Sequence, residues 1–146
     1  MNRLLLTTMI LFGSVSLLRA QTKHTVGENF GGGIVIQVKE WGKHGLIVEK
    51  KDFIKISMSD MAVVADKTLH SGEAAKYDDW RVPTNSELQL LYAQRALIGG
   101  FKPGGYYWHA MTGIQKVTGC INFKNGSQIN PINLPKLALV RPVRDF

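Results

Sequence analysis

The sequence predicts an α+β fold in which two helices pack against mainly antiparallel strands. Runs rich in aliphatic and aromatic residues, typical of strands, occur at 34–39, 46–48, 106–110, 117–123 and 137–146. Helix-start signals followed by apolar residues at helical spacing occur at 57–69 and 84–96. The 146 residues suit one domain.

Residues 1–20 have the layout of a secretory signal peptide. Arg3 supplies an early positive charge, an apolar run follows from Leu4 to Leu18, and Ala20 is a small residue at the cleavage point. The run is shorter than the roughly 20 residues that a membrane span needs. We therefore expect export to the periplasm, cell surface or medium, with no membrane span after cleavage. An uncleaved anchor helix is the alternative.

Charge and cysteine content limit the partners. Cleavage after Ala20 removes two arginines and no acids, which leaves 16 Lys+Arg against 11 Asp+Glu, a net charge of +5. This balance favours anionic partners, and since an exported protein has little access to nucleic acid, we expect an anionic glycan or cell-surface polymer. A soluble surface that merely avoids neutrality is the alternative. Cys120 is the single cysteine, so a hydrophobic core must hold the domain.

The first half of the domain is predicted to begin with a hairpin. Glycine-rich residues 21–33 are expected to form a flexible lead-in, so the domain would span 34–146. Residues 34–39 alternate between apolar and polar, residues 40–45 are turn-like, and residues 46–48 form the returning strand. The first helix is expected to begin at Ser57, with Asp60 completing the start signal, and to end at Ser71-Gly72.

The stretch around Pro83 is predicted to be structural. Thr84 can cap the second helix while Glu87 reaches back to complete a capping box, and Pro83 keeps the preceding residue extended. Just upstream, Trp80 is expected to fill the core and Arg81 to pair with a carboxylate. The helix would end at Gly99-Gly100, with an apolar stripe of Leu88, Leu91, Tyr92 and Ala96.

From Phe101 onward the chain is predicted to be all β. Asn125-Gly126 indicates a hairpin, because both residues accept positive φ. The final strand, 137–146, contains Pro142, which cannot donate to a ladder. We therefore expect this strand to lie at an edge or to be bulged at the proline.

Several segments follow the order of a known bacterial domain family. They are Phe30-Gly-Gly-Gly-Ile-Val-Ile, Gly42-Lys-His-Gly-Leu-Ile-Val, Asp79-Trp-Arg-Val-Pro-Thr, Ile98-Gly-Gly-Phe, Tyr106-Tyr-Trp, Phe123-Lys-Asn-Gly-Ser-Gln and Val140-Arg-Pro-Val-Arg-Asp-Phe. The first and last of these segments lie close to the two ends of the chain after residue 20, so the resemblance spans nearly all of it. The order resembles the bacterial domain of unknown function 1566, the C-terminal domain type of the Legionella collagen-like adhesin.

This resemblance implies a compact C-type-lectin-like domain with its N- and C-terminal strands close together. It also implies extracytoplasmic binding or adhesion, with sulfated polysaccharides as a ligand class. The Trp80-Arg-Val-Pro-Thr run is similar to a corner in formylglycine-generating-enzyme domains. The family usually has Trp-Ser-Ser where this chain has Trp108-His109-Ala110, which puts any ligand contact by those hydroxyls in doubt.

No catalytic or metal-binding set stands out in the sequence. The formylglycine-generating oxidase uses paired cysteines, whereas Cys120 stands alone and is best explained as a small buried residue. The four histidines show no metal-ligand spacing. We therefore expect no enzymatic activity, no metal and no cofactor, although a hydrolase that pairs Cys120 with a distant histidine stays open.

The C-terminal third is one-sidedly basic and supplies the candidate ligand-binding residues. Flexible lysines attract sulfate or carboxylate groups by screened Coulomb forces, without demanding a fixed geometry. Arg141 and Arg144 are three residues apart and face opposite sides of a regular strand, so we expect one to be internal and paired and the other to be available for a surface patch. We assign Arg141 to the structural set and Arg144 to the candidates. The candidates are Lys102, Lys116, Lys124, Lys136 and Arg144, with Trp108 as a sugar-stacking ring.

The sequence thus predicts an exported, non-enzymatic binding or adhesion module for anionic glycans or cell-surface polymers. A structural or protein-binding accessory subunit of a bacterial envelope assembly is the first alternative. A cryptic hydrolase is the second.

Overall fold

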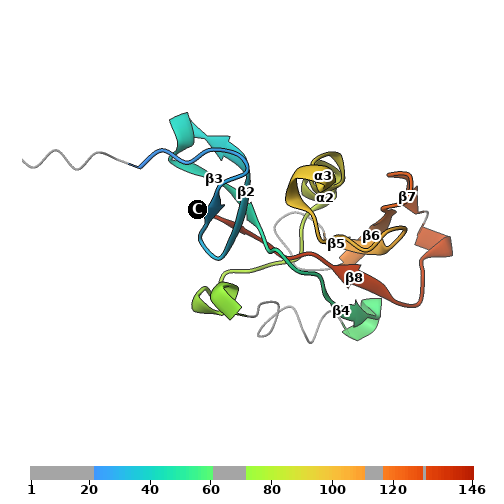
Figure 1. Ribbon diagram of the computed structural model, residues 1–146. Coiled ribbons are helices and arrows are strands. Elements are labelled where there is room, and N and C mark those ends of the chain that lie inside the picture. The colour runs from blue at the N-terminus through green and yellow to red at the C-terminus, as the bar shows by residue number, and fades with distance from the viewer. Residues whose placement is uncertain (1–21, 61–71, 111–116, 130) are drawn as a thin grey trace, which may run out of the picture.

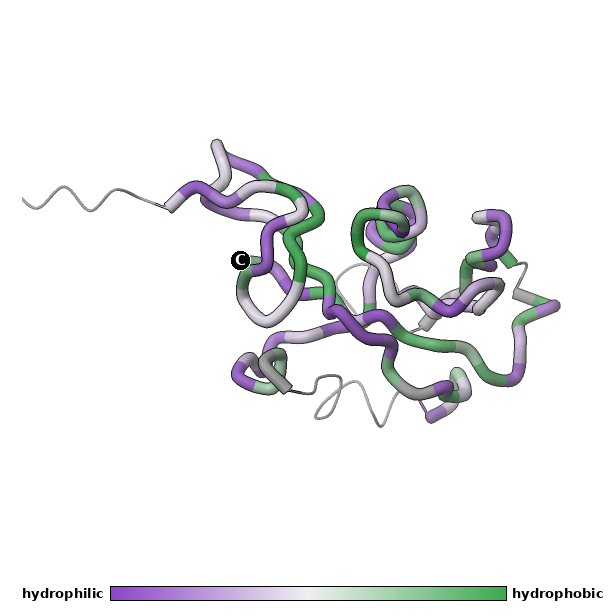
Figure 2. The backbone as a smooth tube through the Cα atoms, viewed as in Figure 1, coloured by the Kyte–Doolittle hydropathy of each residue, from purple (hydrophilic) through white to green (hydrophobic). Residues whose placement is uncertain are grey.

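A computed structural model describes residues 22–60, 72–110, 117–129 and 131–146. The chain forms two mostly antiparallel sheets that lie side by side, with two short helices over the second (Figure 1). The predicted α+β class is confirmed. Hydrophobic segments occur within strands of both sheets, and a hydrophilic stretch marks the place where residues 49–52 cross between the sheets (Figure 2).

The first sheet has the order β1-β2-β3-β9 and is antiparallel throughout. Its strands are β1 (Asn29–Phe30), β2 (Gly33–Lys39), β3 (His44–Val48) and β9 (Val143–Asp145). The predicted hairpin is confirmed as β2 and β3. β1 pairs with β2, so the second half of the expected lead-in belongs to the sheet. The first and last strands share this sheet, with β2 and β3 between them.

The second sheet has the order β4-β8-β5-β6-β7. β5 and β8 pair in parallel, and the other pairs are antiparallel. Its strands are β4 (Phe53–Ile56), β8 (Ala138–Val140), β5 (Tyr106–Ala110), β6 (Val117–Asn122) and β7 (Gln128–Ile129). Helix α2 packs on β5 and β6.

Two chain segments cross from one sheet to the other at the same place. Residues 49–52 lead from β3 to β4, and residues 141–142 lead from β8 to β9. The predicted last strand is therefore two strands in different sheets. Pro142 has no N–H for a ladder, and its carbonyl accepts a bond from the Glu49 N–H at 2.9 Å, which holds the two crossing segments together.

The second helix begins as predicted but is broken. The Thr84 hydroxyl accepts from the Glu87 N–H at 3.3 Å, and the Glu87 carboxylate accepts from the Thr84 N–H at 2.7 Å, so the capping box is present. The chain then forms α2 (Asn85–Ala93) and α3 (Arg95–Ile98), because Gln94 leaves helical geometry and donates its side-chain N–H to the Ile36 carbonyl.

The break changes the apolar stripe. Leu88 and Leu91 are buried as predicted, and Tyr92 is half-buried. Ala96 was placed wrongly on the stripe, because it is exposed, and Ile98 is buried instead. The helix ends at Gly99 and Gly100, whose φ values of 71° and 68° favour glycine.

Three further short elements are 3-10 helices: η1 (Glu40–Gly42), η2 (Gly72–Lys76) and η3 (Pro131–Asn133). At the expected first helix, residues 58–60 are helical and the Asp60 N–H donates to the Ser57 hydroxyl at 3.2 Å. The remainder of that prediction, from residue 61 to residue 71, lies outside the described residues.

The β6–β7 hairpin is confirmed, but its turn differs from the expected one. Gly126 has φ 78°, whereas Asn125 does not have a positive φ. The Asn125 side chain instead accepts bonds from the N–H and the hydroxyl of Ser127, as in an Asx turn. The hairpin signal therefore located the turn correctly and mispredicted its type.

The Trp80–Thr84 segment joins the two sheets. Arg81 forms a two-way backbone bridge with Val143 of β9, and the Pro83 carbonyl accepts from the Ala110 N–H of β5. The Arg81 side chain donates to both Glu87 oxygens at 2.8 Å and to Asp145 at 2.8 Å. Trp80 is buried and its indole N–H donates to the Ala74 carbonyl. The segment is a structural corner, as predicted.

We predict that Glu87→Gln makes the protein less stable at neutral pH and less sensitive to acid. Burial opposes ionisation of Glu87, but bonds from Arg81 and the Thr84 N–H outweigh it and hold its pKa below the ordinary 4.5. A depressed pKa in the folded state gives stability above the unfolded pKa that is lost as the pH falls through the folded value. Urea unfolding at neutral pH should show a loss of about 1–3 kcal/mol.

Below pH 4.5, wild type should lose free energy of unfolding more steeply than Glu87→Gln. Glu40→Gln is the control, because the Glu40 side chain is 70% exposed and its ion pair with His44 is long, at 3.5 Å. Equal pH dependence in wild type and Glu87→Gln would contradict the assignment.

Candidate functional site

A basic groove of about 420 Å³ lies on the surface beside α3. Three cationic side chains, from Arg95, Lys102 and Lys124, line it. Phe101 and Phe123 supply aromatic walls, with ring centroids 4.9 Å apart. No carboxylate occurs among the described residues that line the groove, so its electrostatic potential favours anions.

Each cation is held by its local backbone. Arg95 follows the helix break, donates to the Tyr92 carbonyl at 2.7 Å and lies 4.0 Å over the Tyr92 ring. Lys102 stands in the loop after Gly100, where its carbonyl accepts from the Gly105 N–H. The Lys124 N–H donates to the Asn122 side chain at 2.8 Å. The lysine side chains are exposed, so they can adjust to a ligand.

One bond joins the two loops that carry the lysines. The Phe123 N–H donates to the Gly105 carbonyl at 2.8 Å. A Cβ on Gly104, which has φ 66°, would lie 4.0 Å from the Lys124 Cβ. The two lysines therefore belong to one surface although 22 residues separate them in sequence.

A buried polar network supports this groove from below. The Lys102 N–H donates to the Tyr107 hydroxyl at 2.7 Å, and that hydroxyl donates to Asp52 at 2.6 Å. Burial and the bond to Asp52 raise the pKa of Tyr107, so it stays protonated and able to donate. Asp52 also accepts from Arg141 at 2.6 Å, and the Arg141 guanidinium lies 4.0 Å from the Phe101 ring centroid.

The structure separates the predicted ligand residues into different places. Lys102 and Lys124 lie together in the groove. Lys136 is exposed but does not line the groove, and Lys116 lies outside the described residues.

Arg144 and Trp108 do not have the exposed positions that the prediction needed. Arg144 donates to both oxygens of Asp79, at 2.6 and 3.0 Å, and lies 4.0 Å over the Tyr77 ring. Trp108 is 0% exposed, and its indole N–H donates to the Ile56 carbonyl. Trp108 therefore offers no face to a sugar, and Arg144 is engaged in holding the corner to β9.

Arg95, Phe101 and Phe123 were missed as site residues. In an unbroken helix Arg95 would lie on the apolar stripe, seven residues after Leu88 and four after Leu91, so its exposed position depends on the break at Gln94. Phe101 follows directly on the helix end at Gly99-Gly100. That position indicated the start of a loop, but nothing nearby indicated that the ring would line a groove. Phe123 was taken as a strand end.

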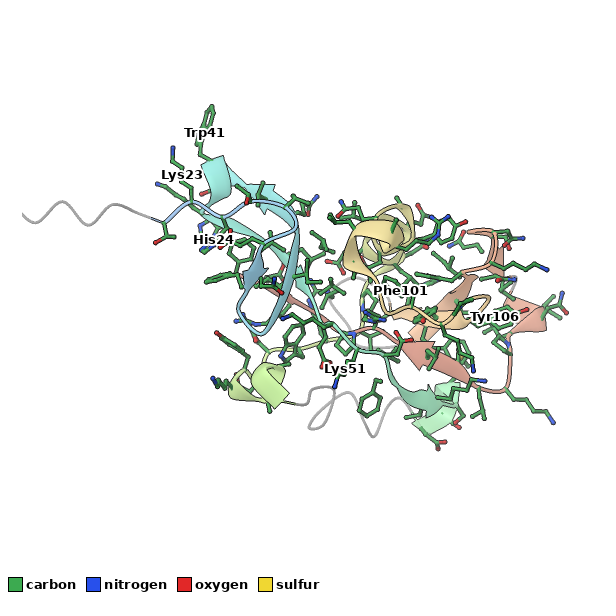
Figure 3. All side chains as sticks on the ribbon, in the orientation of Figure 1. Lys23, His24, Trp41, Lys51, Phe101 and Tyr106 are labelled. Carbon is green, nitrogen blue, oxygen red and sulfur yellow. The ribbon has the colours of Figure 1, made fainter. Side chains whose placement is uncertain are left out.

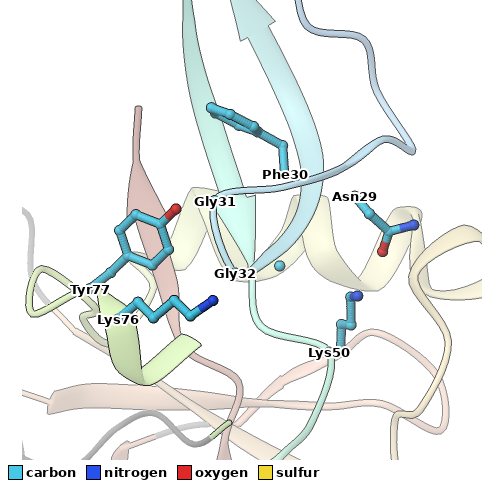
Figure 4. A pocket seen from close by; sticks show the side chains of 8 residues that line it. Asn29, Phe30, Gly31, Gly32, Lys50, Lys76 and Tyr77 are labelled. Atoms are coloured by element: carbon cyan, nitrogen blue, oxygen red, sulfur yellow. The ribbon is translucent and has the colours of Figure 1, made fainter. Parts of the chain in front are cut away.

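A second hollow, of about 240 Å³, lies under the glycine turn between β1 and β2 (Figure 4). Lys50 and Lys76 extend into it from different segments, and Tyr77 forms a wall. Gly32 is required here, because a Cβ at its φ of 87° would lie 2.9 Å from the Ala74 Cα. The lining includes no carboxylate among the described residues. The sequence pattern did not reveal this hollow.

Cys120 lies in the core with its side chain inaccessible. It is 0% exposed, and burial raises its pKa to about 11. It pairs across the strands with Trp108, whereas His109 pairs with Gly119. Neighbouring strand positions point to opposite faces, so His109 and Cys120 do not face each other. Burial also lowers the pKa of His109.

Two observations bear on metals and membranes. Within the described ranges, no group of three His, Cys, Asp or Glu side chains is placed to hold a metal ion. In the same part of the chain, no helix has the length and apolar character to cross a bilayer.

No family model matches the chain, and a search of curated proteins finds no significant match.

We predict that Arg141→Met destabilises the protein by about 3–5 kcal/mol, because it leaves Asp52 and several carbonyls without their buried donor. Arg141→Lys should also lower the free energy of unfolding. A guanidinium has five N–H donors spread around a plane, whereas an ammonium has three on one atom and cannot reach all of these partners. Urea unfolding measures both. Arg95→Met, at an exposed position, is the control and should cost less than about 1 kcal/mol. Similar losses at both positions would contradict the assignment.

We predict that Cys120 resists thiol reagents in the native protein. With an inaccessible sulfur and a pKa of about 11, little thiolate is available at mildly alkaline pH. The reaction with dithionitrobenzoate should be at least about 100-fold slower than in guanidinium chloride. Equal rates in the folded and unfolded chains would show that the thiol is accessible.

Proposed function

We propose that this chain is an exported, non-enzymatic module that binds anionic polymers through the groove of Arg95, Lys102 and Lys124. The observation that carries the proposal is that three cationic residues line one groove with aromatic walls. No carboxylate occurs among the described residues of its lining. Anionic glycans and cell-surface polymers present repeated sulfate, carboxylate or phosphate groups that such a surface attracts.

The chemistry of the groove suits a polymer segment. Exposed lysines are flexible point charges that tolerate variable spacing between anionic groups, and Arg95 can donate to one group through two parallel bonds. Phe101, which is half-buried, offers an apolar edge for the CH-rich face of a sugar ring, and the buried Phe123 ring packs behind it. Binding of this kind is screened by salt.

We also propose a C-type-lectin-like architecture related to the domain of unknown function 1566. Its support is the shared order of motifs along the chain. The corner formed by Trp80–Thr84, which bridges the two sheets, adds to this support. Rings of His24, Phe30 and Phe146 contact one another, so the N-terminal segment meets the last residue.

The test is retention of the chain from residue 21 on immobilised heparin and on neutral glycans across a salt series. Wild type should bind heparin at low salt, lose it steeply as salt rises, and ignore neutral glycans. Lys102→Ala with Lys124→Ala should weaken binding by about three- to thirtyfold near physiological salt.

The matched control is Lys55→Ala with Lys136→Ala. This double variant removes the same charge from exposed lysines outside the groove. Equal weakening by both double variants would show that binding depends on the net charge of the protein and not on the groove, which would contradict the proposal. If wild type is not retained on heparin even at low salt, the proposal is wrong.

A further inference from the structure

The β2–β3 hairpin presents a tryptophan to solvent. Trp41 is 86% exposed, whereas Trp80 and Trp108 are 5% and 0% exposed. It lies in η1 at the outer end of the hairpin, and its ring points away from the rest of the domain (Figure 3). A large aromatic side chain in this position has no role in the core.

The turn that carries Trp41 is held in an unfavourable conformation. Glu40, Trp41 and Gly42 have successive φ values of 47°, 60° and 88°, and Glu40 and Trp41 are the only non-glycine residues with positive φ in the described ranges. Glycine or asparagine adopts this conformation more easily. Backbone strain of this kind is found where a position serves binding.

Neighbouring residues keep this turn in place. The Gly42 carbonyl accepts from the His24 N–H at 3.0 Å, and the Glu40 carbonyl accepts from the Lys43 N–H at 3.3 Å. A Cβ on Gly42 would lie 2.7 Å from the His24 carbonyl oxygen. The turn therefore presents the indole from a fixed backbone, which lowers the entropy lost on binding.

Three lysines lie in or beside the turn that carries the exposed ring. Lys39 and Lys43 flank the turn. Lys23 packs beside Gly42, because the Lys23 Cβ lies 3.3 Å from the position that a Cβ on Gly42 would take. All three are exposed. Glu40 is the one carboxylate within the turn, and it lies 3.5 Å from His44. The hairpin tip, defined as Lys23 with residues 39–43, thus carries a net positive charge.

The exposure of Trp41 favours insertion over stacking. A sugar platform rests one ring face on the protein, but a ring that is 86% exposed is open on both faces. The indole prefers the interface between water and lipid, where its apolar body and its N–H are both satisfied. Lysines beside it are attracted to anionic headgroups.

In the sequence, Lys23 of the tip follows the apolar N-terminal segment closely. Lys23 is five residues after Leu18, the end of that segment, so at most about 18 Å of extended chain separates them. If residues 4–18 enter a bilayer during export or remain as an anchor, the hairpin tip is held beside that bilayer. We propose that the hairpin tip docks on the surface of an anionic membrane, with Trp41 inserted among the headgroups. This role is separate from the groove and uses none of its residues.

The first measurement is tryptophan fluorescence of the chain from residue 21, which contains every described element. Vesicles of phosphatidylcholine, with and without phosphatidylglycerol, are added. Because Trp80 and Trp108 are buried, a blue shift and protection from acrylamide quenching report on Trp41. Both changes are expected with anionic vesicles and should fade as salt rises. Their absence with anionic vesicles would overturn the proposal.

Trp41→Asn separates binding from folding. Asparagine tolerates positive φ, so the variant should unfold at a temperature a few degrees higher than wild type. It should nevertheless lose co-sedimentation with anionic vesicles by about tenfold or more. Binding that persists in Trp41→Asn would overturn the proposal. A lower unfolding temperature together with lost binding would also overturn it, because Trp41 would then be structural.

Charge and site controls complete the experiment. Lys39→Ser with Lys43→Ser should weaken vesicle binding by roughly fivefold per lysine. Leu97→Ala, at a residue 56% exposed on α3, and the Lys55→Ala, Lys136→Ala double variant should leave it unchanged. A blue shift with heparin but not with vesicles would assign Trp41 to a glycan and overturn the membrane proposal.

Discussion

The structure depends on one buried cation, Arg141, at the point where the chain crosses between the sheets. Arg141 is 0% exposed and donates to Asp52 and to four carbonyls, those of Glu49, Lys50, Gly99 and Gly100. These partners come from the β3–β4 crossing and from the end of α3. A buried charge is tolerated only when it is fully paired, so the crossing, the helix end and the groove wall adopt one joint arrangement.

Local interactions are the part of the fold that the sequence could predict. The capping box of Thr84 and Glu87 needs only residues three apart, and the hairpin of β2 and β3 follows from alternation around a short turn. The three-residue offset between Arg141 and Arg144 indicated that one of them would be internal, and the structure buries Arg141. Each of these features depends on residues that are close in the chain, so a sequence pattern can predict it.

Long-range contacts account for what the sequence could not show. The helix breaks at Gln94 because its amide meets Ile36, 58 residues earlier. Arg144 is withdrawn from the candidate patch by Asp79, 65 residues away. In the groove, Lys102 and Lys124 were both recognised as basic, but their meeting with Arg95 depends on loop packing that no periodicity encodes. The sequence could therefore predict single basic residues of the groove, but it could not predict which of them lie together.

The shared sheet of β1 and β9 has a mechanical consequence. The Phe146 backbone exchanges two hydrogen bonds with Gly45 of β3, while the rings of Phe30 and Phe146 meet at 5.4 Å. Tension applied between residue 22 and residue 146 would therefore load the first sheet and its aromatic clasp. The second sheet, with the groove, lies outside that force path. Such a domain can be pulled while the groove keeps its shape.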